Sequence, residues 1–208
     1  MTAQTESDFG AHSDHSLLNV LAFGSKDVPN ILGFREYITE VSSHFCPYIE
    51  PSMAKNETVY TVVSSSTNDK GVAEKIVFAS GYALSELLRH KRTQSSKDRQ
   101  CPPLLCENAL FLFPHIDDAI GKELFGWPHW VLKCRYTQLG ILFGKFGKGA
   151  VETSKDGSDL PIPPCHLLSV RESVRARDPQ FFEHAEWFRP SLESSNDIGQ
   201  NVFGDLTE

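Results

Sequence analysis

Apolar side chains recur every three or four residues in two segments of the chain, the spacing of a helix with one buried face. The first segment is 33–45, and Pro47 is expected to end its helix because proline lacks a backbone N–H donor. The second runs from Val72 to Arg92, and glycine at position 81 weakens its helix propensity. Its apolar positions are Ala73, Ile76, Val77, Leu84, Leu87 and Leu88. Both segments are predicted to be amphipathic helices.

Strands are predicted where short runs are rich in β-branched or aliphatic residues. These runs are 58–65, 109–113 and 165–170, with 139–146 interpreted either as a strand or as the end of a helix. Further helices are expected at 116–125, 127–136 and 179–188, and a long loop at 147–164. The elements follow no regular βαβ repeat. The expected fold class is therefore α+β, with a small mixed or antiparallel sheet of about four strands covered by helices.

The composition is that of one globular domain, since 40% of the 208 residues are hydrophobic and 23% are charged. Polar residues dominate both ends of the chain. Residues 1–15 are expected to be a disordered N-terminal tail, residues 16–190 a single domain, and residues 191–208 a polar C-terminal tail.

Charge, hydropathy and cysteine content argue against several classes of protein. The net charge of −7 is unusual for a nucleic-acid binder, and the basic segment 89–99 is interpreted as a solvated helix end rather than a phosphate-contacting patch. Every apolar run is shorter than the ~20 residues that span a bilayer, so no membrane partner is expected. Five widely spaced cysteines, and no signal peptide in the first residues, predict reduced thiols and a cytoplasmic location.

The segment from His44 to Tyr48 carries the most suggestive candidate chemistry. Cys46 lies at a helix end beside Pro47, where unpaired backbone groups favour a thiolate that acts as a catalytic nucleophile or a soft ligand. His44 is a candidate haem ligand or base. The alternative, which is the more common arrangement, is a buried structural thiol beside a helix-ending proline.

Two further histidines are candidate cofactor ligands. His129 lies between Trp127 and Trp130, whose indoles would line either a haem or aromatic pocket or a corner of the core. His166 follows Cys165 at the start of a predicted strand, where neighbouring side chains point to opposite faces. These two residues are therefore not expected to share a metal, and no zinc-binding spacing occurs elsewhere, so no metal site is predicted.

Arg171 and Glu172, at the end of the predicted strand 165–170, are the remaining catalytic candidates. The planar arginine fork suits a substrate carboxylate, and a glutamate serves as a base. The alternative is a surface ion pair. The loop 142–149 holds three glycines and two lysines, but it lacks the order of a phosphate-binding P-loop and is interpreted as a flexible turn.

Several motifs between residues 30 and 190 follow one another in a recognisable order. They are Cys46-Pro47-Tyr48, the apolar stretch 132–146, the Pro-x-Pro-Pro…Val-Arg stretch 161–171, and the Asp-Pro-Gln-Phe-Phe stretch 178–182. This order resembles an uncharacterised, mainly bacterial family of domains found in natural-product gene clusters. It is distantly similar to the YqcI/YcgG family, some of whose members are haem-dependent N-oxygenases. The resemblance implies a role in secondary metabolism, with Cys46 and Arg171 at the site.

The chain departs from the family pattern where that pattern has histidines. Phe146-Gly147-Lys148 stands in place of Phe-His-Pro, and Val170-Arg171-Glu172 in place of Ile-Arg-His. If haem binds, its ligand is therefore expected among the histidines His44, His129 and His166.

Three functions follow as hypotheses. The first is a biosynthetic enzyme, as a haem-dependent oxygenase of an amino-acid-like or polyketide-like small molecule, with Arg171 binding a substrate carboxylate and Cys46 lining the pocket. Trp127 and Trp130 would supply its apolar walls. The second is a non-catalytic accessory or ligand-binding protein that associates with a pathway enzyme. The third is a cofactor-free isomerase or cyclase with Glu172 or His166 as its base.

Overall fold

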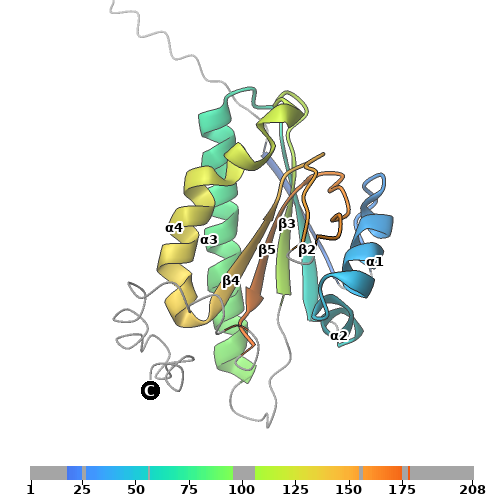
Figure 1. Cartoon of the computed structure of the whole chain (residues 1–208). Helices are drawn as coiled ribbons and strands as arrows, with labels where there is room; N and C mark the ends of the chain where they lie inside the picture. The colour runs from blue at the N-terminus through green and yellow to red at the C-terminus, as the bar shows by residue number, and fades with distance from the viewer. Residues whose placement is uncertain are drawn as a thin grey trace, which may run out of the picture.

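The computed structural model describes residues 18–24, 27–55, 57–95, 106–154, 157–174 and 178. These residues form a mixed sheet with helices packed on both of its faces (Figure 1). The predicted α+β fold class is confirmed. The expected tails at 1–15 and 191–208, and the expected helix at 179–188, lie outside the described residues.

The sheet has five strands in the order β1-β2-β3-β5-β4. The strands are β1 (Leu18–Phe23), β2 (Thr58–Ser65), β3 (Cys106–Leu112), β4 (Ile141–Phe146) and β5 (His166–Glu172). Strands β2 and β3 are parallel, while every other neighbouring pair is antiparallel. A parallel pair needs a crossover connection, and a long helix between β2 and β3 provides it.

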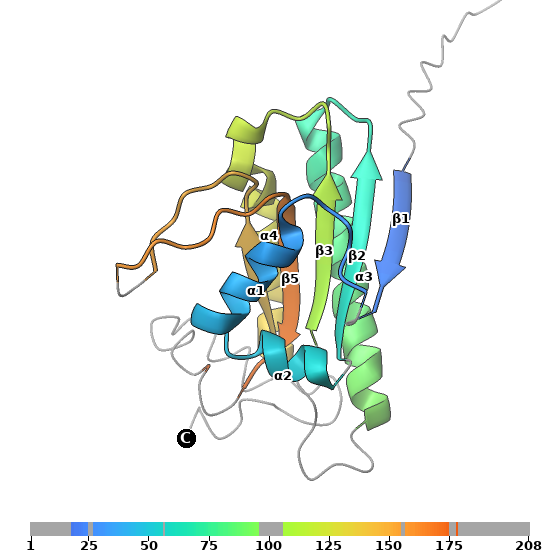
Figure 2. The ribbon, with the colours of Figure 1, turned by 90° about the vertical axis from the view of Figure 1, so that its right-hand side faces the viewer.

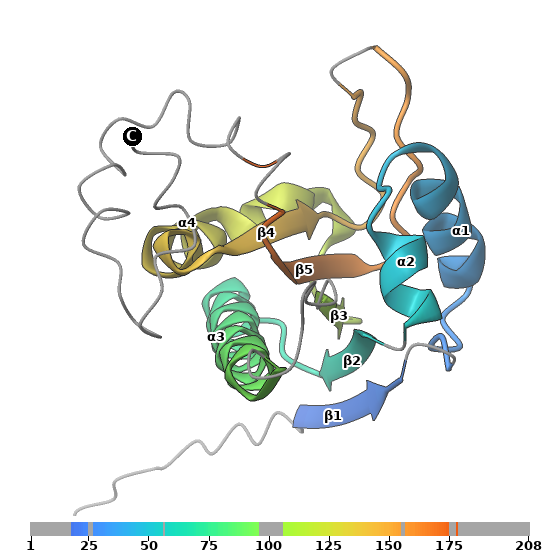
Figure 3. The same ribbon diagram turned by 90° about the horizontal axis from the view of Figure 1, so that it is seen from below.

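The helices divide between the two faces of the sheet (Figure 2, Figure 3). They are α1 (Phe34–His44), α2 (Ile49–Ala54), α3 (Lys70–Ser95) and α4 (Gly126–Tyr136), with 3-10 helices η1 (Asp118–Phe125) and η2 (Thr137–Leu139). Helices α1 and α2 cover one face, and α3 and α4 lie against the other. No helix among the described residues is both long enough and apolar enough to cross a lipid bilayer.

Each face of the sheet has its own hydrophobic core. On the α3–α4 face, buried residues from both helices pack on Ala109 and Phe111 of β3 and on Leu168 of β5. On the α1 face, Phe34 and Tyr60 are completely buried, and their rings meet edge to face at 5.6 Å. Alternate residues of β3 and β5 therefore serve opposite cores, as the two-residue repeat of a strand requires.

Two elements, β1 and α2, were not predicted, because their local sequence patterns do not indicate a strand or a helix. Strand β1 is the fifth strand, where about four were expected; it lies at the sheet edge and its side chains are mostly exposed, so it shows no apolar alternation. Helix α2 contains Pro51, which is tolerated there because it lies in the first turn, before a backbone donor is needed.

The segment expected as a helix at 116–125 is a kinked 3-10 helix instead. Asp117 caps its first turn, with Oδ1 accepting a 2.9 Å hydrogen bond from the backbone N–H of Ala119. Gly121 then adopts a φ of 38°, which breaks the regular helix and turns the chain toward α4. The predicted helical segment is therefore present, but it begins at Asp118 rather than Ile116 and is a 3-10 helix.

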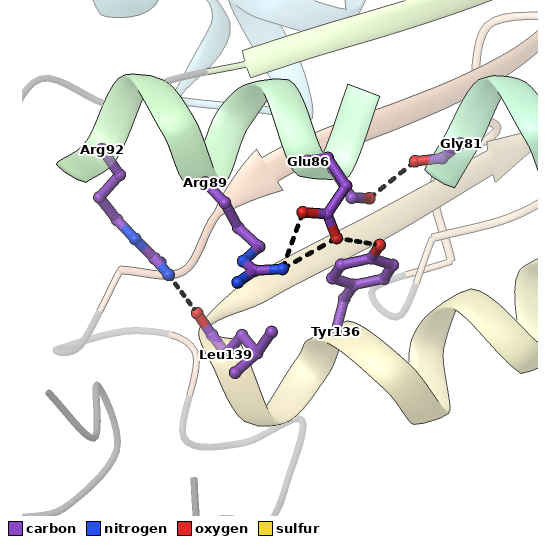
Figure 4. Close-up of polar contacts among 7 residues, drawn as sticks. Gly81, Glu86, Arg89, Arg92, Tyr136 and Leu139 are labelled. Atoms are coloured by element: carbon purple, nitrogen blue, oxygen red, sulfur yellow. Dashed lines mark hydrogen bonds and ion pairs between the residues drawn. The ribbon is translucent and has the colours of Figure 1, made fainter. Parts of the chain in front are cut away.

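Polar side chains fasten α3 to the end of α4 (Figure 4). The Tyr136 hydroxyl donates a 2.5 Å hydrogen bond to Glu86, whose carboxylate also binds Arg89. One turn further on, Arg92 donates a 2.7 Å hydrogen bond to the backbone carbonyl of Leu139. These contacts fix the end of α4 relative to α3, and with it the side chains of α4 that lie beside the edge strand β4.

Candidate functional site

A cavity of about 360 Å³ lies on the α1–α2 face of the sheet, above β3, β5 and β4. Alternate residues of these strands form its floor: Cys106, Asn108, Leu142, Gly144, Phe146, Leu167, Ser169 and Arg171. Helix α1 contributes Tyr37, Ile38 and Val41 to the opposite wall. The lining is mainly apolar with a few convergent polar groups, the composition usual for small-molecule sites. We call this space the main cavity.

Helix α4 lines the edge of the main cavity with His129, Lys133 and Thr137. These residues are four positions apart, so they follow one another along a single face of the helix. Lys133 and Thr137 were not among the candidates chosen from the sequence. Their regular spacing from His129 is the signal that could have found them.

Thr137 is the polar group in this lining that the fold leaves unsatisfied. The residue is 1% exposed, and its Oγ1 has no hydrogen-bond partner among the described residues. A buried hydroxyl without a partner costs about 1–3 kcal/mol. A ligand atom that hydrogen-bonds to this hydroxyl would recover that cost.

Two cysteines line the main cavity from different elements. Cys46 follows the end of α1, and its backbone N–H donates to the Val41 carbonyl at 2.8 Å, which continues the helical turn to the residue before Pro47. Cys106 begins β3, and its sulfur lies 3.6 Å from the Ser169 hydroxyl. Burial raises the pKa of the Cys106 thiol to about 11, so this group is a neutral thiol at pH 7.

The electrostatics at the α4 edge favour a neutral histidine among positive charges. Burial lowers the pKa of His129, and the nearby ammonium groups of Lys145 and Lys133 lower it further, against a hydrogen bond to the Phe143 backbone that raises it. No acidic residue occurs among the described residues that line the main cavity. The edge is therefore positive in a protein whose net charge is −7.

Arg171 lines the main cavity, but its fork already holds a carboxylate. Its two terminal nitrogens donate hydrogen bonds of 2.9 Å to the two oxygens of Asp178, whose side chain is 1% exposed. The guanidinium also lies 4.7 Å from the ring centre of Tyr48, a cation–π contact. The carboxylate bound by Arg171 is thus supplied by the chain itself, and the residue holds the wall of the cavity together.

The structure brings together three of the six residues proposed from the sequence, namely Cys46, His129 and Arg171. His44 is exposed at the end of α1 and lies outside the lining. Glu172 shares the sheet face of Leu168 and Val170, which pack on α3 and α4, so it lies on the opposite side of the sheet.

His166 lies in a second cavity, of about 510 Å³, at the end of β3. Its Nδ1 accepts a 3.1 Å hydrogen bond from the backbone N–H of Lys148, and burial lowers its pKa. Lys148 forms an ion pair of 2.8 Å with Asp118. His166 and Lys148 therefore already have polar partners within the protein, so the polar groups of this larger cavity do not require a ligand.

The two tryptophans do not form apolar walls of the main cavity, contrary to expectation. Trp130 is 53% exposed, and Trp127 is 40% exposed. The Trp127 indole donates a 2.9 Å hydrogen bond to Glu74 and packs 5.3 Å from the Phe78 ring. The alternative, a corner of the core, holds only in part: His129 is half-buried and hydrogen-bonds the Phe143 backbone, but both indoles are exposed.

The main cavity by itself is small for a haem. His129 is the one predicted ligand in the cavity, and its bond to the Phe143 backbone is of the kind that orients ligating histidines. The volume of about 360 Å³, however, is near the lower end for sites that hold drug-sized molecules, and haem is larger than these. Haem binding stays a prediction of the family resemblance.

Comparisons of the chain with protein-family models, with curated proteins and with solved structures find no match in any of the three. The main cavity itself is therefore the basis on which a function is inferred.

Proposed function

We propose that this protein binds a small, largely apolar molecule in the main cavity. The observation that carries the proposal is the Thr137 hydroxyl, buried and without a partner among the described residues, in the wall of an apolar cavity of ligand size. Asn108 and Ser169 add polar groups on the floor, so a ligand with one polar end and an apolar body suits the lining.

The biological setting that we propose is a natural-product pathway, in which the protein holds or carries a metabolite beside a pathway enzyme. The order of motifs from Cys46 to Arg171 supports this setting. Two observations favour this binding role. The Arg171 guanidinium already binds Asp178, so it is not free for the substrate carboxylate that the oxygenase hypothesis requires. Glu172 lies on the far face of the sheet, so it cannot act as a base in the main cavity.

A cavity-filling substitution tests the proposal. Ser169→Phe should place a ring inside the main cavity and abolish binding of the neutral probe octan-1-ol in isothermal titration calorimetry. Ser64→Phe is the matched control, because Ser64 lines the second cavity on the same sheet face and should leave binding intact. Binding lost in the Ser64 variant but kept in the Ser169 variant would assign the ligand to the wrong cavity and overturn the proposal.

A cofactor-free isomerase or cyclase is the second candidate, and one observation favours it. Burial keeps His129 neutral at neutral pH inside an apolar cavity, which is the state a general base requires. Under this proposal His129 replaces His166 and Glu172 as the base. Deuterium exchange at the carbon next to the carbonyl of octan-2-one should then be accelerated by the wild-type protein and not by His129→Gln; equal rates would exclude the base role.

A further inference from the structure

A third cavity, of about 270 Å³, adjoins the main cavity beneath α1. The two share the residues Tyr37, Val41, Cys46 and Phe146 in their walls. Beyond these shared residues the third cavity is lined by Phe45 and by the loop that follows β4, while His129, Lys133 and Thr137 line the main cavity alone. We call this third space the outer chamber. The two spaces are therefore neighbours, and α4 lines only the main cavity.

Phe146 stands at the boundary between the two spaces. Its ring lies against Gly144, where a Cβ atom would be only 3.0 Å from Cε2 and 3.2 Å from Cζ of the ring. The absence of a side chain at Gly144 therefore lets the ring lie close to the sheet. Phe146 is half-buried and lines both cavities, so a larger side chain at this position would narrow the space where they adjoin.

The outer chamber offers almost nothing polar to a ligand. Its loop side consists of Ala150, Leu160, Pro161 and Pro163, together with Glu152. Glu152 is already paired, with its carboxylate 3.0 Å from the Lys122 ammonium. Burial raises the pKa of Tyr37 above its usual value, so its phenol stays neutral. This chamber suits a hydrocarbon tail.

Positive charge gathers at the α4 edge of the main cavity. Among the described residues, Lys133 and Lys145 have no acidic partner within ion-pair distance, and both act on His129. Arg171 differs, because Asp178 balances its charge. Lys133 lines the main cavity, so its ammonium is the uncompensated charge available to a ligand there.

We propose that the main cavity and the outer chamber form one elongated site for an aliphatic carboxylate. The carboxylate lies at Lys133 with Thr137 as a hydroxyl donor, the chain crosses the floor past Phe146, and the tail fills the outer chamber. This inference rests on the proposed binding function and names its ligand class. It also sets chain length and a negative head group as the two determinants of affinity.

Affinity for straight-chain acids tests the length determinant. From hexanoate through octanoate to decanoate, each methylene buried should strengthen binding by about fourfold in calorimetry. Phe146→Trp should narrow the passage, so that affinity stops rising after octanoate. Val151→Trp, at a 75% exposed position, is the control and should keep the wild-type series. A series that is flat in the wild type, or unaffected by Phe146→Trp, would overturn the two-chamber site.

The head group is tested with octanoate, octan-1-ol and octylamine. Wild-type protein should bind octanoate at least tenfold more tightly than octan-1-ol, since hydrogen bonds to charged groups are worth about 1.5–3 kcal/mol. Lys133→Met should remove this preference, and Lys75→Met, at an exposed position of α3, should retain it. Equal binding of acid and alcohol, or tighter binding of the amine, overturns the carboxylate inference and leaves the proposed function intact. Failure of all three probes to bind overturns both.

Discussion

At the scale of single residues, the buried hydroxyl of Thr137 is the strongest indication that the main cavity binds a ligand. A hydroxyl without a partner costs free energy in the empty protein and becomes useful when a ligand supplies the missing hydrogen bond. Lys133 adds the charge and His129 the neutral ring on the same face of α4. The polar end of the cavity is thus built by three residues of one helix face.

Replacing Thr137 by valine keeps the shape and removes the hydroxyl. We expect Thr137→Val to raise the free energy of unfolding by about 1 kcal/mol, because an unsatisfied polar group is deleted. Thr58→Val is the matched control, since the Thr58 hydroxyl is buried and donates a 2.7 Å hydrogen bond to Ser52. This control should lose about 1 kcal/mol in urea denaturation. Equal losses in both variants would show that the Thr137 hydroxyl has a partner in the free protein.

The buried histidines make stability depend on pH. Burial lowers the pKa of both His129 and His166 in the folded protein, while the unfolded chain keeps a value of about 6.5. Below that pH the unfolded chain binds protons that the folded protein resists, so the stabilisation present above pH 6.5 is lost as the pH falls. His129→Gln should flatten the fall in unfolding free energy between pH 7 and pH 5, with the exposed His44→Gln as control. An unchanged slope in His129→Gln would contradict the burial of its ring.

At the scale of elements, Gly81 allows α3 to pack closely against α4 and the sheet. A Cβ atom there would overlap Leu132 Cδ1 of α4 and lie 2.8 Å from Leu168 Cδ2 of β5. The glycine that weakens α3 by helix propensity is therefore a point where α3 packs closely against both α4 and the sheet. Sequence periodicity located α3 but could not show this contact, because the partners are distant in the chain.

Gly81→Ala should destabilise the protein although alanine is the better helix former. Overpacking of this kind costs about 1–3 kcal/mol, which outweighs a propensity gain of about 1 kcal/mol. The reverse exchange, Ala79→Gly at an exposed position of the same helix, should lose only the propensity, about 1 kcal/mol. Chemical denaturation measures both. A more stable Gly81→Ala variant would show that α3 has room to move away from α4.

Four buried elements were predictable, although by different signals. Helices α1 and α3 carry the spacing of one buried helical face, whereas β2 and β3 are marked by short β-branched or apolar runs. Strand β1 was not predictable, since its side chains are mostly exposed on both faces of the sheet edge. The 3-10 character of η1 depends on the backbone angle of Gly121, which composition does not specify.

At the scale of the whole molecule, residues far apart in the sequence come together to form the main cavity. Cys46, His129 and Arg171 come from the end of α1, from α4 and from β5, and they meet only when the sheet is assembled. Their residue types suggested chemistry, but the sequence could not show that Asp178 fills the Arg171 fork or that Glu172 faces the other core.

The central claim is that an aliphatic ligand occupies the main cavity, and a two-dimensional ¹H–¹⁵N NMR titration with octanoate tests it most directly. We expect saturable shifts of the amide signals of Lys133, Thr137, Ser169 and Cys46, while the amide signals of Ser64 and His166 in the second cavity stay unchanged. Shifts confined to the second cavity, or none that saturate, would contradict it.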